Sequence, residues 1–160
     1  MKVEFKDFPV TKFDPTKGAK CFQLVEPFRF IVDRDLIEIP IGFYTDWAST
    51  GPAASIISPV DPQICRPALA HDFLYFVNWI NCKTACDQVL AVGMLVEGAP
   101  LWKRLIVYVG VFIGGWYAWN RYRRDNTKFH QTPQFNSLRA GQPMTLLTIA
   151  NWKYDKERMC

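Results

Sequence analysis

The chain has 160 residues and a net charge of +4, with 49% hydrophobic and 21% charged residues. This composition excludes a globally disordered chain and is sufficient for one buried core. The charge is uneven, because residues 1–120 carry 11 basic and 12 acidic side chains whereas residues 121–160 carry 8 and 3. The basic C-terminal quarter suits nucleic acid, an anionic membrane surface or an acidic partner, or else a solvated tail.

The N-terminus and the cysteines indicate whether the chain is secreted and whether its thiols are oxidised. Residues 1–7 contain no apolar stretch of the kind that a signal peptide requires. An odd number of scattered cysteines in such a chain predicts reduced thiols. The five cysteines are Cys21, Cys65, Cys82, Cys86 and Cys160.

The first 44 residues predict an antiparallel β-sheet. Candidate strands are residues 3–6, 21–25, 28–32 and 36–40. The last two flank Asp33-Arg34-Asp35, which predicts a hairpin with a three-residue connection. The sheet ends just before Thr45, where a polar segment begins, and such positions often carry function.

Three helices are predicted after this polar loop, with bounds of about 62–79, 83–97 and 101–123. Asp61 is the expected N-cap of the first helix and Pro62 its first residue, although Pro67 could separate the first turn from the rest. The connection between the first two helices is short, so they should run antiparallel.

The third predicted helix contains an uncharged, aromatic-rich stretch from Leu105 to Asn120. Only about 12 residues of it are strongly apolar, whereas a membrane-spanning helix needs roughly 20. The stretch therefore predicts a buried core helix. Its basic flanks, Lys103-Arg104 and Arg121 with Arg123 and Arg124, leave a membrane-associated helix as the alternative.

The elements together predict an α+β fold, in which a small N-terminal antiparallel sheet packs against three helices. We expect residues 1–124 to form a single domain and residues 125–160 to form an extended basic C-terminal arm. The antiparallel pair of helices carries His71 and Asp87.

His71 and Asp87 are equally distant in sequence from the turn near Trp79, so the hairpin should place them at the same level. Packed helix axes lie about 8–10 Å apart, which lets an inward His and Asp form a hydrogen bond. Tyr75 follows His71 by one helical turn and shares its face. Asp72 points elsewhere and should meet the 45–50 loop.

These residue types suit acid–base chemistry. An Asp that holds one imidazole nitrogen leaves the other nitrogen to act as a general base. The candidate catalytic residues are His71, Asp87, Tyr75 and Ser49, the last as a nucleophile. Asp72 and Asp46 are candidate ligands of a divalent cation such as calcium. The same groups could instead form a satisfied polar network without chemistry.

The order of four motifs resembles an uncharacterised domain found mainly in tailed bacteriophages and prophages. The motifs are Ile39-Pro40-x-Gly42-Phe43-x-Thr45-Asp46-x-Ala48-Ser49, Ala70-His71-Asp72-x-Leu74-Tyr75, Ala85-Cys86-Asp87 and Gly115-Trp116-x-Ala118-Trp119. The resemblance implies a phage origin. It marks as signature positions Asp46, Ser49, His71, Asp72, Tyr75 and Asp87.

A second, local resemblance involves the helix pair. His71-Asp72-x-x-Tyr75 and Cys86-Asp87 are similar to the catalytic helices of secreted phospholipase A2. The resemblance implies that His71 is the general base, that Asp72 binds calcium and that Asp87 orients His71. The glycine-rich calcium loop and the disulfide framework of that family are absent from the sequence.

The sequence therefore predicts a bacteriophage accessory or virion-associated protein with a hydrolase-like His/Asp pocket. The alternative is an active hydrolase acting on a lipid ester or the cell envelope. A third hypothesis is a host-directed regulator that binds an acidic partner or nucleic acid, although the tail has no recognised nucleic-acid motif. Expected partners are other phage structural proteins and a membrane or cell-envelope surface, in the virion or the host cytoplasm.

Overall fold

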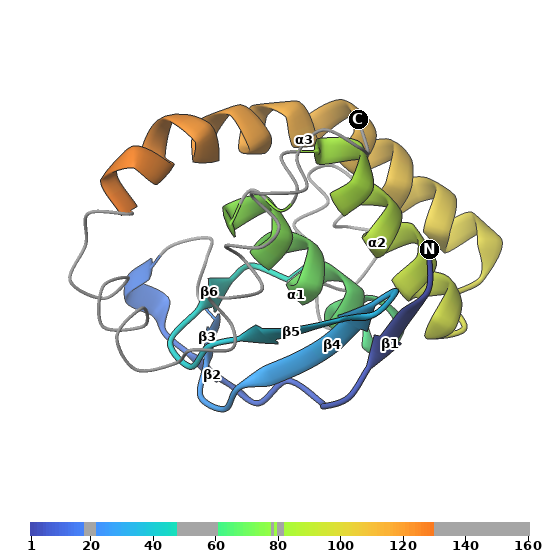
Figure 1. The fold of residues 1–160 in the computed structure, drawn as a ribbon, viewed down its shortest axis with the longest axis horizontal. Coiled ribbons are helices and arrows are strands. Elements are labelled where there is room, and N and C mark those ends of the chain that lie inside the picture. The colour runs from blue at the N-terminus through green and yellow to red at the C-terminus, as the bar shows by residue number, and fades with distance from the viewer. Residues whose placement is uncertain (18–21, 48–60, 78, 80–81, 130–160) are drawn as a thin grey trace.

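The computed structural model describes residues 1–17, 22–47, 61–77, 79 and 82–129, with the backbone alone for Lys17 and residues 122–129. The α+β class is confirmed. Two small sheets lie beneath the helices α1 and α2, and α3 arches over the opposite side of these two helices (Figure 1). The predicted arm lies largely outside the described residues, and its first five residues continue α3.

The strands form two three-stranded antiparallel sheets rather than one. The first has the order β1-β4-β5 and the second the order β2-β3-β6. Their bounds are β1 Val3–Phe5, β2 Thr11–Phe13, β3 Phe22–Leu24, β4 Phe28–Val32, β5 Asp35–Ile39 and β6 Tyr44–Thr45. β2, an exposed three-residue strand, was not predicted from the sequence, and it is followed by a short 3-10 helix, Pro15–Lys17.

The β4–β5 hairpin builds the floor of the core. Phe28, Phe30 and Val32 are buried while Arg29 between them is exposed, which is the two-residue period of a strand with one covered face. Phe30 pairs with Ile37. This register places both apolar side chains on the face that the helices cover.

The hairpin connection is one residue shorter than predicted. Val32 pairs with Asp35, so the loop contains only Asp33 and Arg34. Asp33 has a φ of 55°, a left-handed conformation that Asp tolerates better than most residues. Two-residue loops with positive φ match the right-handed twist of paired strands, which explains why pairing extends to Asp35.

The helix α1 (Pro62–Val77) starts as predicted. Asp61 accepts a hydrogen bond through Oδ1 from the backbone N–H of Gln63 at 2.9 Å. The helix continues through Pro67 without a break. The ring of Pro67 is buried against Gly93 of α2, where an added Cβ would lie 3.1 Å from the Pro67 Cβ. Glycine at this position therefore allows the two helices to approach closely.

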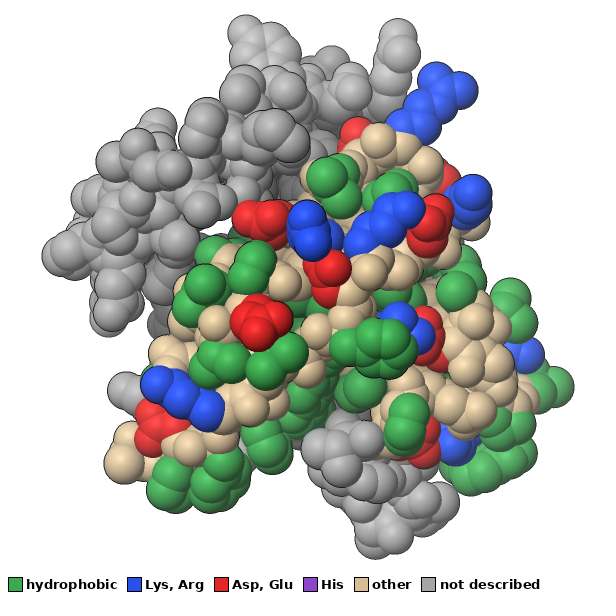
Figure 2. All heavy atoms as spheres, turned by 90° about the horizontal axis from the view of Figure 1, so that it is seen from below, with side chains coloured by type: hydrophobic (Ala, Val, Ile, Leu, Met, Phe, Trp, Pro, Cys, Tyr) green, Lys and Arg blue, Asp and Glu red, His purple; other side chains and the backbone are tan. Residues whose placement is uncertain are grey.

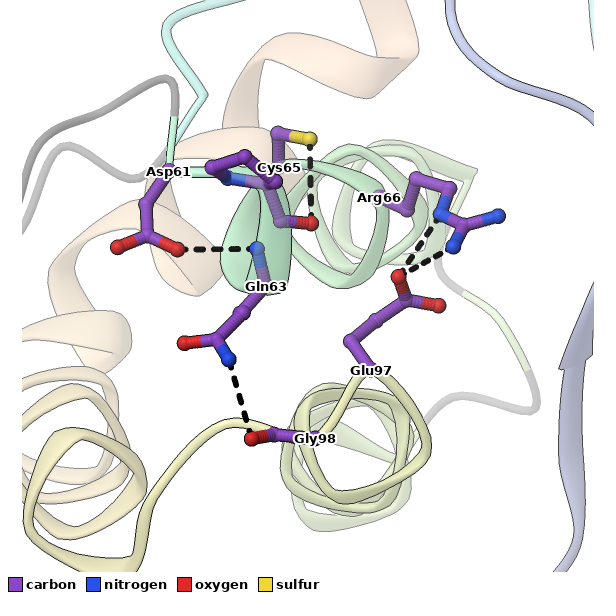
Figure 3. A network of polar contacts seen from close by, with 7 residues as sticks. Asp61, Gln63, Cys65, Arg66, Glu97 and Gly98 are labelled. Atoms are coloured by element: carbon purple, nitrogen blue, oxygen red, sulfur yellow. Dashed lines mark hydrogen bonds and ion pairs between the residues drawn. The ribbon is translucent and has the colours of Figure 1, made fainter.

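Polar contacts tie the start of α1 to the end of α2 (Lys83–Val96), as Figure 3 shows. Arg66 pairs with Glu97, and Nε2 of Gln63 donates to the Gly98 carbonyl at 3.1 Å. Lys103, in the first turn of α3 (Leu101–Phe129), reaches the Asp61 carboxylate at 2.7 Å. These contacts hold all three helices together at the open end of the helical hairpin.

The prediction of reduced thiols is wrong for Cys82. This residue, directly before α2, is disulfide-bonded, whereas Cys65 and Cys86 are not. Cys82 is buried in the main core cluster next to the hairpin turn. The sequence argument failed here because five scattered cysteines do not reveal which of them meet in space.

Only one face of α3 belongs to the core. Val107, Gly115 and Trp119 are buried, whereas Val109, Ile113 and other apolar residues are exposed. The expectation of a buried core helix therefore holds for the inner face alone. Among the described residues, no helix is long and apolar enough to cross a membrane.

Two neighbouring glycines of α3 provide a test of this packing. A Cβ on Gly115 would lie 2.7 Å from the Tyr75 hydroxyl and 3.1 Å from Lys83 Cε, whereas a Cβ on Gly114 would meet open space. We expect Gly114→Ala to stabilise the protein by about 0.5–1 kcal/mol because alanine is the better helix former. Gly115→Ala should instead destabilise it. Urea unfolding measures both, and equal shifts would contradict this packing.

Candidate functional site

The carboxylate of Asp87 is the centre of a buried polar cluster between α1 and α2. Its side chain is 2% exposed. Oδ1 lies 3.1 Å from Nε2 of His71 and accepts a hydrogen bond from the Tyr75 hydroxyl at 2.5 Å. Oδ2 lies 2.6 Å from Nζ of Lys83. The contact between His71 and Asp87 that the hairpin spacing predicted is therefore present, and Tyr75, which was expected nearby, also binds Asp87.

These donors explain how the core tolerates a charged group. Burial raises the pKa of Asp87, but hydrogen bonds from His71, Lys83 and Tyr75 outweigh it and hold that pKa below its ordinary value. An ionised carboxylate accepts hydrogen bonds only, so Nε2 of His71 carries the proton in this contact. A neutral imidazole then has its lone pair on Nδ1.

Tyr75 acts as a donor in this cluster. Burial, followed by the hydrogen bond to Asp87, raises the pKa of its hydroxyl far above the ordinary value. The hydroxyl therefore stays protonated and fixes the carboxylate rather than serving as a base. Its ring packs on His71, with 4.0 Å between ring centroids, and meets Trp119 of α3 edge-on at 5.2 Å.

Lys83 is the member of the cluster that the sequence analysis missed. It is the first residue of α2 and 6% exposed, and its ammonium group also donates to the Val111 carbonyl of α3 at 3.3 Å. The rings of Phe112 and Trp116 lie 5.8 and 5.5 Å from Nζ. Its position four residues before Asp87 was the available signal, since such pairs share a helix face.

A second polar contact joins α1 to the end of β6. The Thr45 hydroxyl donates to Oδ2 of Asp72 at 2.7 Å and accepts from the backbone N–H of Trp47 at 2.9 Å. Trp47 has a φ of 57°, a conformation that costs about 1–3 kcal/mol outside glycine. Asp72 thus faces the segment that the sequence predicted, through Thr45.

The remaining predicted site residues are not assembled within the described residues. Ser49 lies outside them, so its role as a nucleophile stays a prediction. Asp46 is half-buried next to Thr45, whose hydroxyl donates to Asp72. In the part of the chain that the structure describes, no group of three or more His, Cys, Asp or Glu residues could hold a metal ion. Calcium binding by Asp72 and Asp46 therefore also stays a prediction.

The residues of the Asp87 cluster lie within a segment that matches a known protein family. Residues 22–111, more than half of the chain, match the model of a family described as protein of unknown function (DUF1353), and the chain belongs to that family. The matched segment includes β6, α1 and α2, but it ends before Gly115 of α3. No curated protein and no solved structure matches the chain.

The Lys83–Asp87 pair gives a direct test of the cluster. Asp87→Leu should destabilise the protein by about 3–5 kcal/mol, because it leaves a buried ammonium group without a counter-charge. The double variant Lys83→Met with Asp87→Leu should recover a large part of this loss. Urea unfolding of both single variants and the double variant gives the coupling free energy.

A matched control is the exposed ion pair between Lys6 and Glu4. Removing Glu4 should change the free energy of unfolding far less than removing Asp87 does, because exposed ion pairs contribute little to stability. Additive effects of the Lys83 and Asp87 substitutions would show that the buried pair is not coupled.

Proposed function

We propose that this protein is an accessory or virion-associated protein of a tailed bacteriophage that contains a hydrolase-type acid–base pocket. The chemical part of the proposal depends on one observation, the contact between the Asp87 carboxylate and Nε2 of His71. The phage part is supported by the order of the four sequence motifs. Most of these motifs lie within the residues that match the family model.

The geometry suits a general base. Asp87 fixes the orientation and tautomer of His71, so that Nδ1 accepts the proton of an attacking water or hydroxyl. The ionised Asp87 then stabilises the resulting imidazolium. As the ester bond breaks, the same proton passes from Nδ1 to the leaving alkoxide. Tyr75 and Lys83 are positioning residues in this scheme, because their contacts hold the Asp87 carboxylate.

A lipid ester or a cell-envelope component is the proposed substrate class. The support is the placement of His71 on one helix and Asp87 on its antiparallel neighbour, which is the arrangement that the resemblance to phospholipase A2 implies. Asp72, one residue after His71, would have the calcium-binding role in that resemblance. Calcium dependence of hydrolysis is therefore part of the proposal.

A second candidate is a phage accessory protein without catalysis. Asp87 has donors on both oxygens, and His71 is only 6% exposed. A cluster of this kind also serves to fix the register of packed helices. Loss of activity without loss of fold distinguishes the two candidates.

The catalytic proposal predicts that His71→Asn abolishes ester hydrolysis. Loss of a general base lowers kcat by about 10²–10⁴-fold. Hydrolysis of short-chain phosphatidylglycerol and of a chromogenic ester should be measured with calcium and with a chelator. His130→Asn, which changes the only other histidine, is the control and should retain activity.

Circular dichroism and urea unfolding should show that the His71→Asn variant still folds. A wild-type protein that leaves both esters and peptidoglycan intact under every condition would remove the catalytic proposal. In that case the second candidate, with Asp87 as a purely structural group, would stand.

The phage proposal predicts that the protein is found in particles of the phage that encodes it. Mass spectrometry of gradient-purified virions should detect its peptides at a constant ratio to the known structural proteins. The host-cell lysate after removal of particles is the control. Peptides found only in that lysate would exclude a virion component and leave an intracellular accessory role.

A further inference from the structure

The helix α3 exposes a continuous apolar stripe, here called the outer face of α3. Six residues define it, and their exposed fractions lie between 51% and 72%. Each lies three or four residues from another member, although the last two are adjacent to one another, and this spacing places all six on one side of the helix. They are Trp102, Leu105, Val109, Ile113, Trp116 and Tyr117.

Most of the outer face points away from the rest of the fold, and the ring of Trp116, at its edge, also lies 5.5 Å from Nζ of Lys83. The inner face of α3, with Val107 and Trp119, packs on α1 and α2, and the two sheets lie on the far side of these helices (Figure 1). From Trp102 to Tyr117 the stripe is roughly 24 Å long at 1.5 Å per residue. Monomeric proteins rarely expose an apolar strip of this length without using it.

The sequence around the outer face is basic. Residues 98–124 contain no Asp or Glu. Arg121, Arg123 and Arg124 follow the stripe in the sequence, whereas at its start Lys103 pairs with Asp61 and Nε of Arg104 is buried. On the face of the molecule that Figure 2 shows from below, by contrast, Lys and Arg side chains lie beside Asp and Glu side chains.

We propose that the outer face of α3 binds the surface of an anionic phospholipid bilayer, with the helix lying in the plane of the interface. Helices that bind in this way combine an apolar face rich in Trp, Phe and Leu with flanking Lys and Arg residues. Trp102, Trp116 and Tyr117 are of the types that concentrate at membrane–water interfaces. The basic residues that follow the stripe attract anionic head groups.

A second copy of the chain is the less suitable occupant. Pairing of two outer faces, parallel or antiparallel, would set this segment against the same acid-free segment of the other copy. Neither arrangement supplies an opposite charge to Arg121, Arg123 and Arg124, whereas an anionic bilayer does.

The proposal does not depend on hydrolysis by His71, although the two sites are adjacent. Phe112 and Trp116 lie within 6 Å of the Lys83 ammonium group, which pairs with Asp87. Contact of α3 with a bilayer would therefore bring the Asp87 cluster close to lipid.

Vesicle flotation of the full chain tests the inference. The probes are vesicles of phosphatidylcholine with one quarter phosphatidylglycerol and vesicles of phosphatidylcholine alone. We expect at least tenfold stronger binding to the anionic vesicles, and a marked decrease as salt screens the attraction. The double variant Val109→Ser with Ile113→Asn should bind the anionic vesicles at least tenfold more weakly than the wild type.

Ile41→Asn is the matched control, because Ile41 is 60% exposed and Ile113 is 72% exposed but Ile41 lies outside α3. It should bind anionic vesicles as the wild type does. Equal binding to both vesicle types, or equal effects of the control and the α3 variant, would overturn the proposal. So would a dimer seen by light scattering that the α3 variant dissociates while vesicle binding is absent.

Discussion

The ionised carboxylate of Asp87, buried between three helices, is the constraint on which the rest of the structure depends. It is stable in the core only while α1 supplies His71 and Tyr75 and α2 supplies Lys83. Lys83 also bonds to a carbonyl of α3, and Gly115 leaves room for that helix to approach. One charge therefore fixes the spacing of all three helices.

The same contacts provide stability and orientation together. A buried ion pair contributes less to stability than apolar packing of the same volume would, because both charges lose their hydration. What it adds is a defined geometry. Asp87 holds Nε2 of His71 and thereby sets the direction of Nδ1, which is the property that the proposed acid–base role requires.

The sequence specified much of the site because helices are periodic. The spacing of His71, Tyr75 and Asp87 around a short turn was sufficient to predict their contacts. Asp61 and Pro62 likewise marked the start of α1 correctly. Lys83 was missed because a lysine at the first turn of a helix is usually solvated, whereas here residues of α3 such as Phe112 and Trp116 lie over it.

The sequence by itself determined the α+β class, the helical hairpin and the pairing of His71 with Asp87, since all three follow from short-range periodicity. The tertiary structure alone decided which face of α3 is buried, that Thr45 is a residue of the predicted 45–50 loop that binds Asp72, and that Cys82 is disulfide-bonded. These features join segments distant in sequence. Apolar residues such as Ile113 have the composition of a core, but only packing determines whether a neighbour covers them.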